Sequence, residues 1–176
     1  MNIAEIKNTI RTVPDFPKKG IIFRDITTLL KNVDAFHSTM EILYQRYQQK
    51  KISKVVGIES RGFIFGASLA EKLHCGFVPI RKPKKLPAET LRQEYQLEYG
   101  TDAIEIHQDA IEREENILLI DDLLATGGTM LAATNLIEQL GGNILEIAFV
   151  IELDFLNGRE KLNKYNVFSL VNYESE

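Results

Sequence analysis

The segment from Asn116 to Thr129, which reads NILLIDDLLATGGT, constrains the fold of this chain more than any other. Its first five residues form an apolar run that predicts a buried strand, and two adjacent carboxylates, Asp121 and Asp122, follow it. Small and hydroxyl residues then lead into a helical pattern that begins near Met130. A strand, a short loop and a helix in this order predict an open α/β sheet, in which ligands bind at the carboxyl ends of the strands.

The same segment has the chemistry that a sugar phosphate needs. The predicted loop consists of Ala125, Thr126, Gly127, Gly128 and Thr129. Backbone N–H groups at a helix N-terminus point at a bound anion, and the helix dipole favours its charge. The glycines let the backbone come close, the threonine hydroxyls add donors, and the preceding carboxylates can accept hydrogen bonds from ribose hydroxyls. We therefore predict a ribose 5-phosphate site. The alternative is that the acids cap a loop and the glycines form only a turn.

Strands and helices alternate along the rest of the chain. One helix is predicted over about 3–11 and a second from about Asp34, its predicted N-cap, to 50; two further helices are predicted to end at about 73 and at 140. Strands are predicted over 54–58, 76–80, 117–120, 144–151 and 167–171. The segment 91–107 alternates weakly around Tyr99 and Gly100 and predicts a hairpin or a mobile flap. Glycines at 141 and 142 predict the end of the last long helix. This order predicts an α/β fold with a mostly parallel, doubly wound sheet.

Composition excludes several classes of function. A chain of 176 residues predicts a single domain, and its net charge of −4 gives no case for binding nucleic acid or an acidic membrane. No apolar run reaches the ~20 residues of a membrane span, and the N-terminus does not resemble a secretory signal, so we expect a cytoplasmic protein. The single cysteine, Cys75, rules out an intramolecular disulfide and predicts a small buried or half-buried filler. His37, His74 and His107 lack the spacing of metal ligands.

Two further polar loops follow predicted strands. Glu59, Ser60 and Arg61 lie between a strand and a helix, where they predict a second anion site; the alternative is a helix start with Ser60 as its cap. A basic run that includes Arg81 and Lys85 follows the next strand, and the alternative there is a solvated loop. Loops at the ends of parallel strands share one edge of the sheet. Together they predict a ligand with phosphate groups at both ends.

The segment at 116–129 resembles the signature of type I phosphoribosyltransferases, which bind phosphoribosyl pyrophosphate (PRPP). The resemblance spans essentially the whole chain and implies the type I phosphoribosyltransferase fold, with an N-terminal hood at about 1–33, a core at about 34–176 and a flexible flap at about 82–107. It implies that the loop at 59–61, with Arg81 and Lys85, binds pyrophosphate. It also implies Mg²⁺ held by the substrate phosphates, with no dedicated protein ligands.

The segment FPKKGIIFRDIT at 16–27 is similar to the hood of the adenine-specific branch of this family. Without the family, it would be interpreted as a surface loop with a few core anchors. The resemblance implies that Ile22, Phe23 and Arg24 contact adenine. It further implies that Glu98 and Tyr99 in the flap close over the reacting centre, where a carboxylate could hold or relay a proton at purine N7.

The resemblance thus implies an adenine phosphoribosyltransferase, in which adenine and PRPP give AMP and pyrophosphate. Its implied catalytic residues are Arg61, Glu98 and Tyr99. The family also implies a homodimer that binds neither nucleic acid nor a membrane. Two alternatives remain open: a related transferase for hypoxanthine, guanine, xanthine or orotate, and a PRPP-sensing regulator without catalytic activity.

Overall fold

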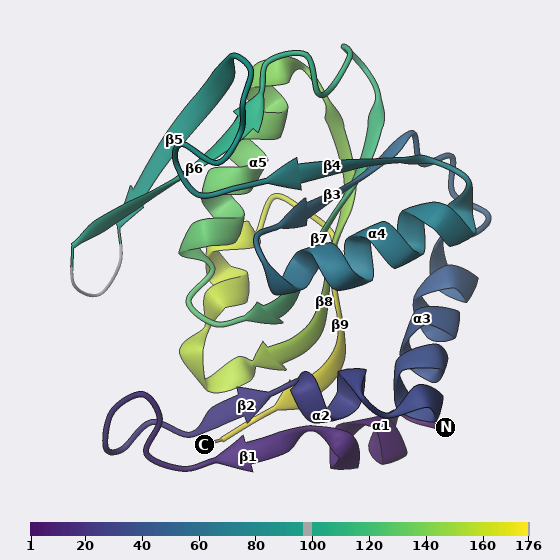
Figure 1. Cartoon of the computed structure of the whole chain (residues 1–176), viewed down its shortest axis with the longest axis vertical. Coiled ribbons are helices and arrows are strands. Elements are labelled where there is room, and N and C mark those ends of the chain that lie inside the picture. Colours follow the sequence, from purple (N-terminus) through teal and green to yellow (C-terminus); the bar gives the residue numbers. More distant parts are fainter. Residues whose placement is uncertain (97–99, 176) are drawn as a thin grey trace.

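The centre of the molecule is a parallel sheet of five strands in the order β4-β3-β7-β8-β9 (Figure 1). The computed structural model describes residues 1–96 and 100–175. The strands are β3 (Lys54–Ile58), β4 (Gly76–Ile80), β7 (Asn116–Leu124), β8 (Asn143–Leu153) and β9 (Val167–Tyr173). The prediction of a mostly parallel, doubly wound sheet is confirmed. Among the described residues, no helix combines the length and apolar composition needed to cross a membrane.

Helices cover both faces of this sheet. On one face lie α1 (Ile3–Thr9), α3 (Val33–Tyr47) and α4 (Arg61–Leu73), and on the other lies α5 (Gly128–Leu140), as Figure 1 shows. Neighbouring strand residues point to opposite faces, so Val55 belongs to the first hydrophobic cluster and Val56 to the second. Burial on both faces explains why the strands read as continuous apolar runs.

The strand order places a binding crevice between β3 and β7. Strand β3 pairs with β4 on one side and with β7 on the other, so the direction in which the sheet is built reverses at β3. Where the strand order reverses, the loops that follow the two neighbouring strands diverge and leave a crevice at their carboxyl ends. The loops after β3 and β7 begin at Glu59 and Ala125, which are the two predicted anion loops.

The residues before α3 build a small hood at one end of the sheet. Its strands β1 (Arg11–Val13) and β2 (Phe23–Asp25) form an antiparallel pair, and the short helix α2 (Thr27–Leu30) follows. In Figure 1 the end of β9 and the C-terminus lie beside this pair. The sequence analysis did not predict this pair of strands.

A long hairpin projects from the other end of the sheet. Strands β5 (Thr90–Gln96) and β6 (Thr101–His107) pair antiparallel, which confirms the predicted hairpin. Backbone hydrogen bonds between Arg81 and Glu105 attach it to the segment after β4. We call β5, β6 and the residues that connect them the flap. Two short 3-10 helices, η1 (Asp154–Leu156) and η2 (Gly158–Leu162), join β8 to β9.

Local details confirm some predictions and correct others. Gly141 ends α5 in the left-handed conformation, with φ at 85°, as the paired glycines predicted. Cys75 is half-buried and packs against the core, as predicted. The prediction of Asp34 as the cap of α3 was wrong: the helix begins earlier, because the Asn32 side chain accepts a hydrogen bond from the Ala35 backbone N–H.

Candidate active site

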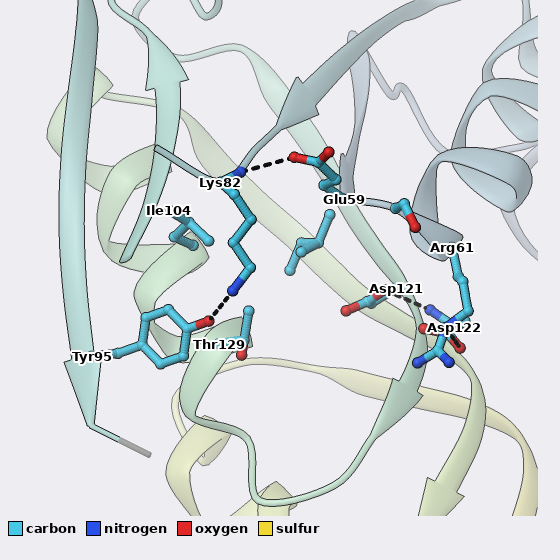
Figure 2. A pocket seen from close by; sticks show the side chains of 10 residues that line it. Glu59, Arg61, Lys82, Tyr95, Ile104, Asp121, Asp122 and Thr129 are labelled. Atoms are coloured by element: carbon cyan, nitrogen blue, oxygen red, sulfur yellow. Dashed lines mark hydrogen bonds and ion pairs between the residues drawn. The ribbon is translucent and has the colours of Figure 1, made fainter. Parts of the chain in front are cut away.

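A cavity of about 370 Å³ opens at the carboxyl ends of β3 and β7, and Figure 2 shows it from close by. Its lining residues come from both predicted anion loops, from the flap and from the segment after β4: Ile58, Glu59, Ser60, Arg61, Lys82, Tyr95, Ile104, Asp121, Asp122 and Thr129. Of these residues, the sequence analysis singled out Glu59, Ser60, Arg61, Asp121, Asp122 and Thr129. The fold therefore brings most of the predicted polar residues to one place.

The two carboxylates lie inside β7 rather than after it. The strand was predicted to end at Ile120, but β8 continues to Leu153 and keeps β7 paired with it through Leu124. Burial raises the pKa of Asp121 well above its ordinary value, and the neighbouring Asp122 charge adds to that effect. Burial also raises the pKa of Asp122, although the Arg61 guanidinium acts in the opposite direction. The pair thus favours a ligand that supplies hydrogen-bond donors or positive charge.

Arg61 connects the two anion loops. Its Nε lies 2.8 Å from Oδ2 of Asp122, which is only 3% exposed. The direction of this contact does not meet hydrogen-bond geometry, and within the described part of the chain that oxygen is buried without a donor. A buried acceptor of this kind is costly unless a ligand satisfies it. A ribose hydroxyl is a donor of suitable size and polarity.

The loop after β7 forms a second, smaller cavity of about 100 Å³ that shares Asp121 and Thr129 with the first. Its lining includes all five predicted loop residues, Ala125 to Thr129. Gly127 precedes α5 with φ at 78°, and no side chain caps the helix start. The first N–H groups of a helix have no partner within it, so they remain available to an anion. The arrangement is that of a phosphate cradle beside a carboxylate pair.

A neighbouring turn, which the sequence analysis missed, supports this cradle. A Cβ added at Gly158 would lie 2.1 Å from the carbonyl oxygen of Ala125, and one added at Gly127 would lie 2.4 Å from the carbonyl oxygen of Gly158. Glycine at both positions is therefore what allows the two backbones to touch. The signal in the sequence was the dipeptide Asn157-Gly158, which is typical of a tight turn.

The loop after β3 forms the second helix N-terminus of the site. Ser60 precedes α4 but makes no capping hydrogen bond through its side chain, so the alternative of a simple cap is not observed. The Glu59–Ser60 peptide is cis. A Cβ at Gly62 would lie 2.8 Å from Oδ1 of Asp121, so this glycine lets α4 start directly beside the carboxylate pair. A second uncapped helix N-terminus therefore faces the larger cavity, which Thr129 at the start of α5 also lines.

The cations of the basic run after β4 make different contacts: one binds Glu59 and another lines the cavity. Arg81 donates to Glu59 through Nη2 at 2.9 Å and lowers the pKa of that carboxyl, and neither Arg81 nor Lys85 lines the cavity. Lys82, which was not predicted, does line it (Figure 2). Its Nζ contacts Asp102 and lies 3.2 Å from the Tyr95 hydroxyl. Burial would lower the pKa of Lys82, but these hydrogen bonds outweigh burial and raise the pKa, so the ammonium group stays protonated.

In the hood, neighbouring residues of β2 have different surroundings. The Phe23 ring lies 5.7 Å from the Arg61 guanidinium and packs edge-on against Phe16. The Arg24 side chain is buried, donates to Thr12 Oγ1 at 2.6 Å and lies over the Tyr173 ring. Ile22 is half-buried next to Phe23. Phe23 therefore lies close to Arg61, which lines the cavity, whereas the Arg24 guanidinium is already engaged elsewhere.

The end of β5 in the flap lies close to the phosphate cradle at Gly128. A Cβ at Gly128 would lie 3.4 Å from the Gln96 carbonyl oxygen and 3.8 Å from the Tyr95 ring. The predicted catalytic residues Glu98 and Tyr99 lie outside the described residues. Their described neighbours in β5 nevertheless come within contact distance of the start of α5.

A metal would have few protein ligands here. Among the described residues, no group of three or more His, Cys, Asp or Glu side chains is arranged to hold an ion. The donors that remain are the Asp121 and Asp122 carboxylates and the phosphates of a ligand. Such a set fits Mg²⁺, which keeps several waters and prefers one or two carboxylates together with substrate phosphates.

Comparisons with known proteins agree with this geometry. The model of the phosphoribosyl transferase domain family matches residues 25–175. The adenine phosphoribosyltransferase of Acidobacterium capsulatum is 57% identical over 173 residues, which cover 98% of this chain and 96% of the relative. The solved adenine phosphoribosyltransferase of Thermoanaerobacter pseudethanolicus superposes with a TM-score of 0.94 at 52% identity, over 98% of this chain and 100% of that one.

A third relative was solved with molecules bound. The adenine phosphoribosyltransferase of Saccharomyces cerevisiae, in complex with adenine and D-2,5-dideoxy-2,5-imino-altritol 1,6-bisphosphate, superposes with a TM-score of 0.90. It is 44% identical and covers 96% of this chain and 97% of its own. That protein binds a purine base and a bisphosphate at the same time.

Proposed function

The chain belongs to the phosphoribosyltransferase family and, within it, to the adenine phosphoribosyltransferases, and we propose that the cleft between β3 and β7 carries this activity. The reaction transfers the 5-phosphoribosyl group from PRPP to N9 of adenine and gives AMP and pyrophosphate. One observation supports this site above all others. Two uncapped helix N-termini face two adjoining cavities that share Asp121 and Thr129, with the Asp121 and Asp122 carboxylates between them. PRPP has the matching order of phosphate, diol and pyrophosphate.

The ribose 5-phosphate half of PRPP fits the end of β7. We assign the 5′-phosphate to the loop from Ala125 to Thr129, whose backbone N–H groups and hydroxyls are donors. Asp121 and Asp122 would accept hydrogen bonds from the ribose hydroxyls, which supplies a donor to the buried Oδ2 of Asp122. The two cavities share Asp121 and Thr129, so one ligand can fill both.

The pyrophosphate half fits the loop after β3. The α4 N-terminus, with Ser60 and Arg61, and the Lys82 ammonium face the same cavity. Glu59 is itself anionic, so we assign it to orienting Arg81 and the Lys82 backbone rather than to touching pyrophosphate. Lys85 accepts a hydrogen bond from Arg81 through its carbonyl, and its charge would act from the rim. Mg²⁺ bound to the leaving group would neutralise the charge that develops on it.

The base fits beneath the hood. We assign the Phe23 ring to stacking on adenine and Ile22 to an apolar wall, because this ring lies near Arg61, which pairs with Asp122 in the cleft. Backbone groups beside these residues would then hydrogen-bond the edge of the base. The buried Arg24 would contribute through its backbone and through the position that its side chain gives to the strand.

The chemistry follows from charge. As pyrophosphate departs, C1′ of the ribose becomes positively charged, and the carboxylates of half-buried Asp121 and buried Asp122 would stabilise that charge. Cationic Arg61 and Lys82 would follow the growing charge on the leaving group. We assign the proton at adenine N7 to Glu98 and the closure that excludes water to the flap with Tyr99. The approach of Tyr95 and Gln96 to the phosphate cradle supports this assignment.

We further propose that the protein works as a cytoplasmic homodimer. The apolar side chain of Ile64, near the start of the helix that begins at Arg61, is 39% exposed. Apolar exposure beside the pyrophosphate loop supports a partner subunit at this face. Light scattering of the purified protein with and without PRPP tests the oligomeric state.

Turnover with a panel of bases tests the function. AMP and pyrophosphate should form from PRPP and adenine, and hypoxanthine, guanine, xanthine and orotate should react far more slowly. If adenine failed while another base reacted, the assignment of the base would be wrong. Binding of PRPP without conversion of any base would instead favour the regulator. The comparisons give neither alternative any support.

The carboxylate pair has a test of its own. Asp122→Asn removes the charge but keeps the size, and the loss of one charged hydrogen bond predicts a fall in kcat/KM for PRPP of about 10- to 100-fold. The exposed Asp109, outside the cleft, gives the matched control Asp109→Asn. Unchanged kinetics for Asp122→Asn would remove Asp122 from the ribose site.

A further inference from the structure

The last strand of the protein makes a contact with the hood that the proposed reaction does not use. Tyr173 ends β9, far along the chain from the hood residues. The Arg24 guanidinium carbon lies 4.1 Å from the centroid of its ring, and the Lys7 ammonium lies 4.3 Å from the same centroid. Lys7 also donates to the backbone carbonyl of Asn172. In Figure 1 the yellow end of β9 runs beside the β1–β2 hairpin.

The hood needs such an anchor because its own sheet is small. Strands β1 and β2 pair over three residues each and are not hydrogen-bonded to the central sheet. A two-stranded hairpin is marginally stable in water by itself. A cation over an aromatic face is an attractive contact that strengthens when both groups lose water, and Arg24 is only 9% exposed. The ring of Tyr173 therefore holds β2 from the side opposite to the cleft.

Because side chains alternate along β2, the contact between Arg24 and Tyr173 also affects the position of Phe23 at the cleft. Phe23 and Arg24 are neighbours in a strand, so their side chains leave it in opposite directions. Arg24 points to Tyr173, and Phe23 lies 5.7 Å from Arg61, which pairs with Asp122 in the cavity. Any rotation or shift of β2 that released Arg24 would also move the Phe23 ring.

We propose that Tyr173 is a positioning residue for base recognition, which acts through Arg24 to hold Phe23 over the cleft. The inference rests on the proposed function, because it takes Phe23 to be the surface on which adenine stacks. It predicts a specific kinetic pattern. Loss of the ring should weaken adenine and leave PRPP untouched, because the phosphate cradle and the carboxylate pair belong to β7 and α5.

The test compares Tyr173→Leu with a control on the same strand. Phe168, also in β9, lies under the Arg46 guanidinium at 4.1 Å, the same distance as Arg24 from Tyr173, but its partner belongs to α3 and not to the hood. Phe168→Leu thus removes one such contact elsewhere, whereas Tyr173→Leu removes two. We expect Tyr173→Leu to raise the KM for adenine about tenfold, which is the size that two such contacts allow, with kcat and the KM for PRPP within twofold.

Conservative and coupled variants complete the design. Tyr173→Phe keeps the ring face and should restore the adenine KM of the unmodified protein. Arg24→Met removes the same contact from the hood side, and its effect should not add to that of Tyr173→Leu. If Tyr173→Leu does not fold, Arg24→Met and Tyr173→Phe still test the contact.

Distinct results overturn the inference and the function on which it rests. Phe23→Leu is the reference: if it leaves the adenine KM unchanged, the assignment of Phe23 as the stacking surface fails. If Phe23→Leu raises that KM but Tyr173→Leu changes it no more than Phe168→Leu does, only the positioning role fails. Equal rises in the KM of adenine and of PRPP, or full additivity with Arg24→Met, also overturn it.

Discussion

Gly158→Ala is the sharpest perturbation that the structure offers, because it changes the phosphate cradle without touching a functional side chain. The added Cβ would lie 2.1 Å from the Ala125 carbonyl oxygen and 3.0 Å from the Gly127 nitrogen. Gly158 does not have a positive φ, so alanine fits its backbone conformation and the effect is purely steric. Gly127→Ala would add backbone strain to the clash and would be harder to interpret.

The size of the effect follows from which partner moves. Ordinary contacts between carbon and its neighbours begin near 3.5 Å, so the two backbones must separate by more than about 1 Å. The turn at Gly158 is fixed to the sheet by Arg159, which donates to Glu152 at 2.9 Å and to the Val167 carbonyl at 2.8 Å. The cradle is therefore the part that shifts. A misplacement of about 1 Å costs about 100-fold in rate, which corresponds to roughly 2.7 kcal/mol.

The assay separates the two ends of the ligand. We expect kcat/KM for PRPP to fall by about 100-fold and the dissociation constant of AMP to rise with it, since both ligands carry a 5′-phosphate. Pyrophosphate has no such group, so its inhibition constant should stay unchanged. Gly76→Ala is the matched control, because there the new Cβ would meet only the flexible side chain of Lys54.

One result would refute this reasoning directly. If Gly158→Ala folds, as its melting temperature would show, and its PRPP and AMP constants stay within threefold of those of Gly76→Ala, then the turn yields and the cradle does not depend on it. A rise in the pyrophosphate constant equal to that of AMP would also refute it, because the whole cleft would then have been disturbed.

The remaining predictions concern the leaving group, the flap and the hood. Lys82→Met should weaken pyrophosphate and PRPP by about 10- to 100-fold and AMP far less, and an equal loss of AMP would exclude a role at the leaving group. Glu98→Gln should lower kcat more than adenine affinity, and the reverse pattern would make Glu98 a binding residue. The Arg11 guanidinium lowers the pKa of Asp25 from 3.8 to about 2. A carboxyl with a lowered pKa stabilises the fold above its unfolded pKa, so Asp25→Asn should lower the free energy of unfolding near pH 6. That difference should vanish in urea titrations as the pH falls from about 4 to about 2, and a difference constant in pH would contradict the assignment.

Much of the cleft was predictable because its residues are contiguous in sequence. The segment at 116–129 contains the carboxylate pair and the phosphate cradle, and parallel strands bring their carboxyl ends to one edge wherever they pair. Local sequence was therefore enough to predict that the loops at 59–61 and 125–129 meet. The end of β7 was predicted too early, because pairing with β8 keeps two charged residues in the strand against their own preference.

Contacts that depend on the direction of a side chain were not predictable in this way. Arg81 and Lys82 are neighbours after β4, and both are cations, so composition alone favoured neither. The bridge between Arg81 and Glu105 fixes the register of this segment. Since neighbours in an extended chain point to opposite sides, this register turns Arg81 toward Glu59 and Lys82 into the cavity. A shift of this pairing register by one residue would exchange the directions of the Arg81 and Lys82 side chains. The same holds in the hood, where Arg24 reaches Tyr173 only because β9 ends beside β2. Pairing between segments that are distant in sequence therefore decides which cation lines the cavity and which is held by Glu59.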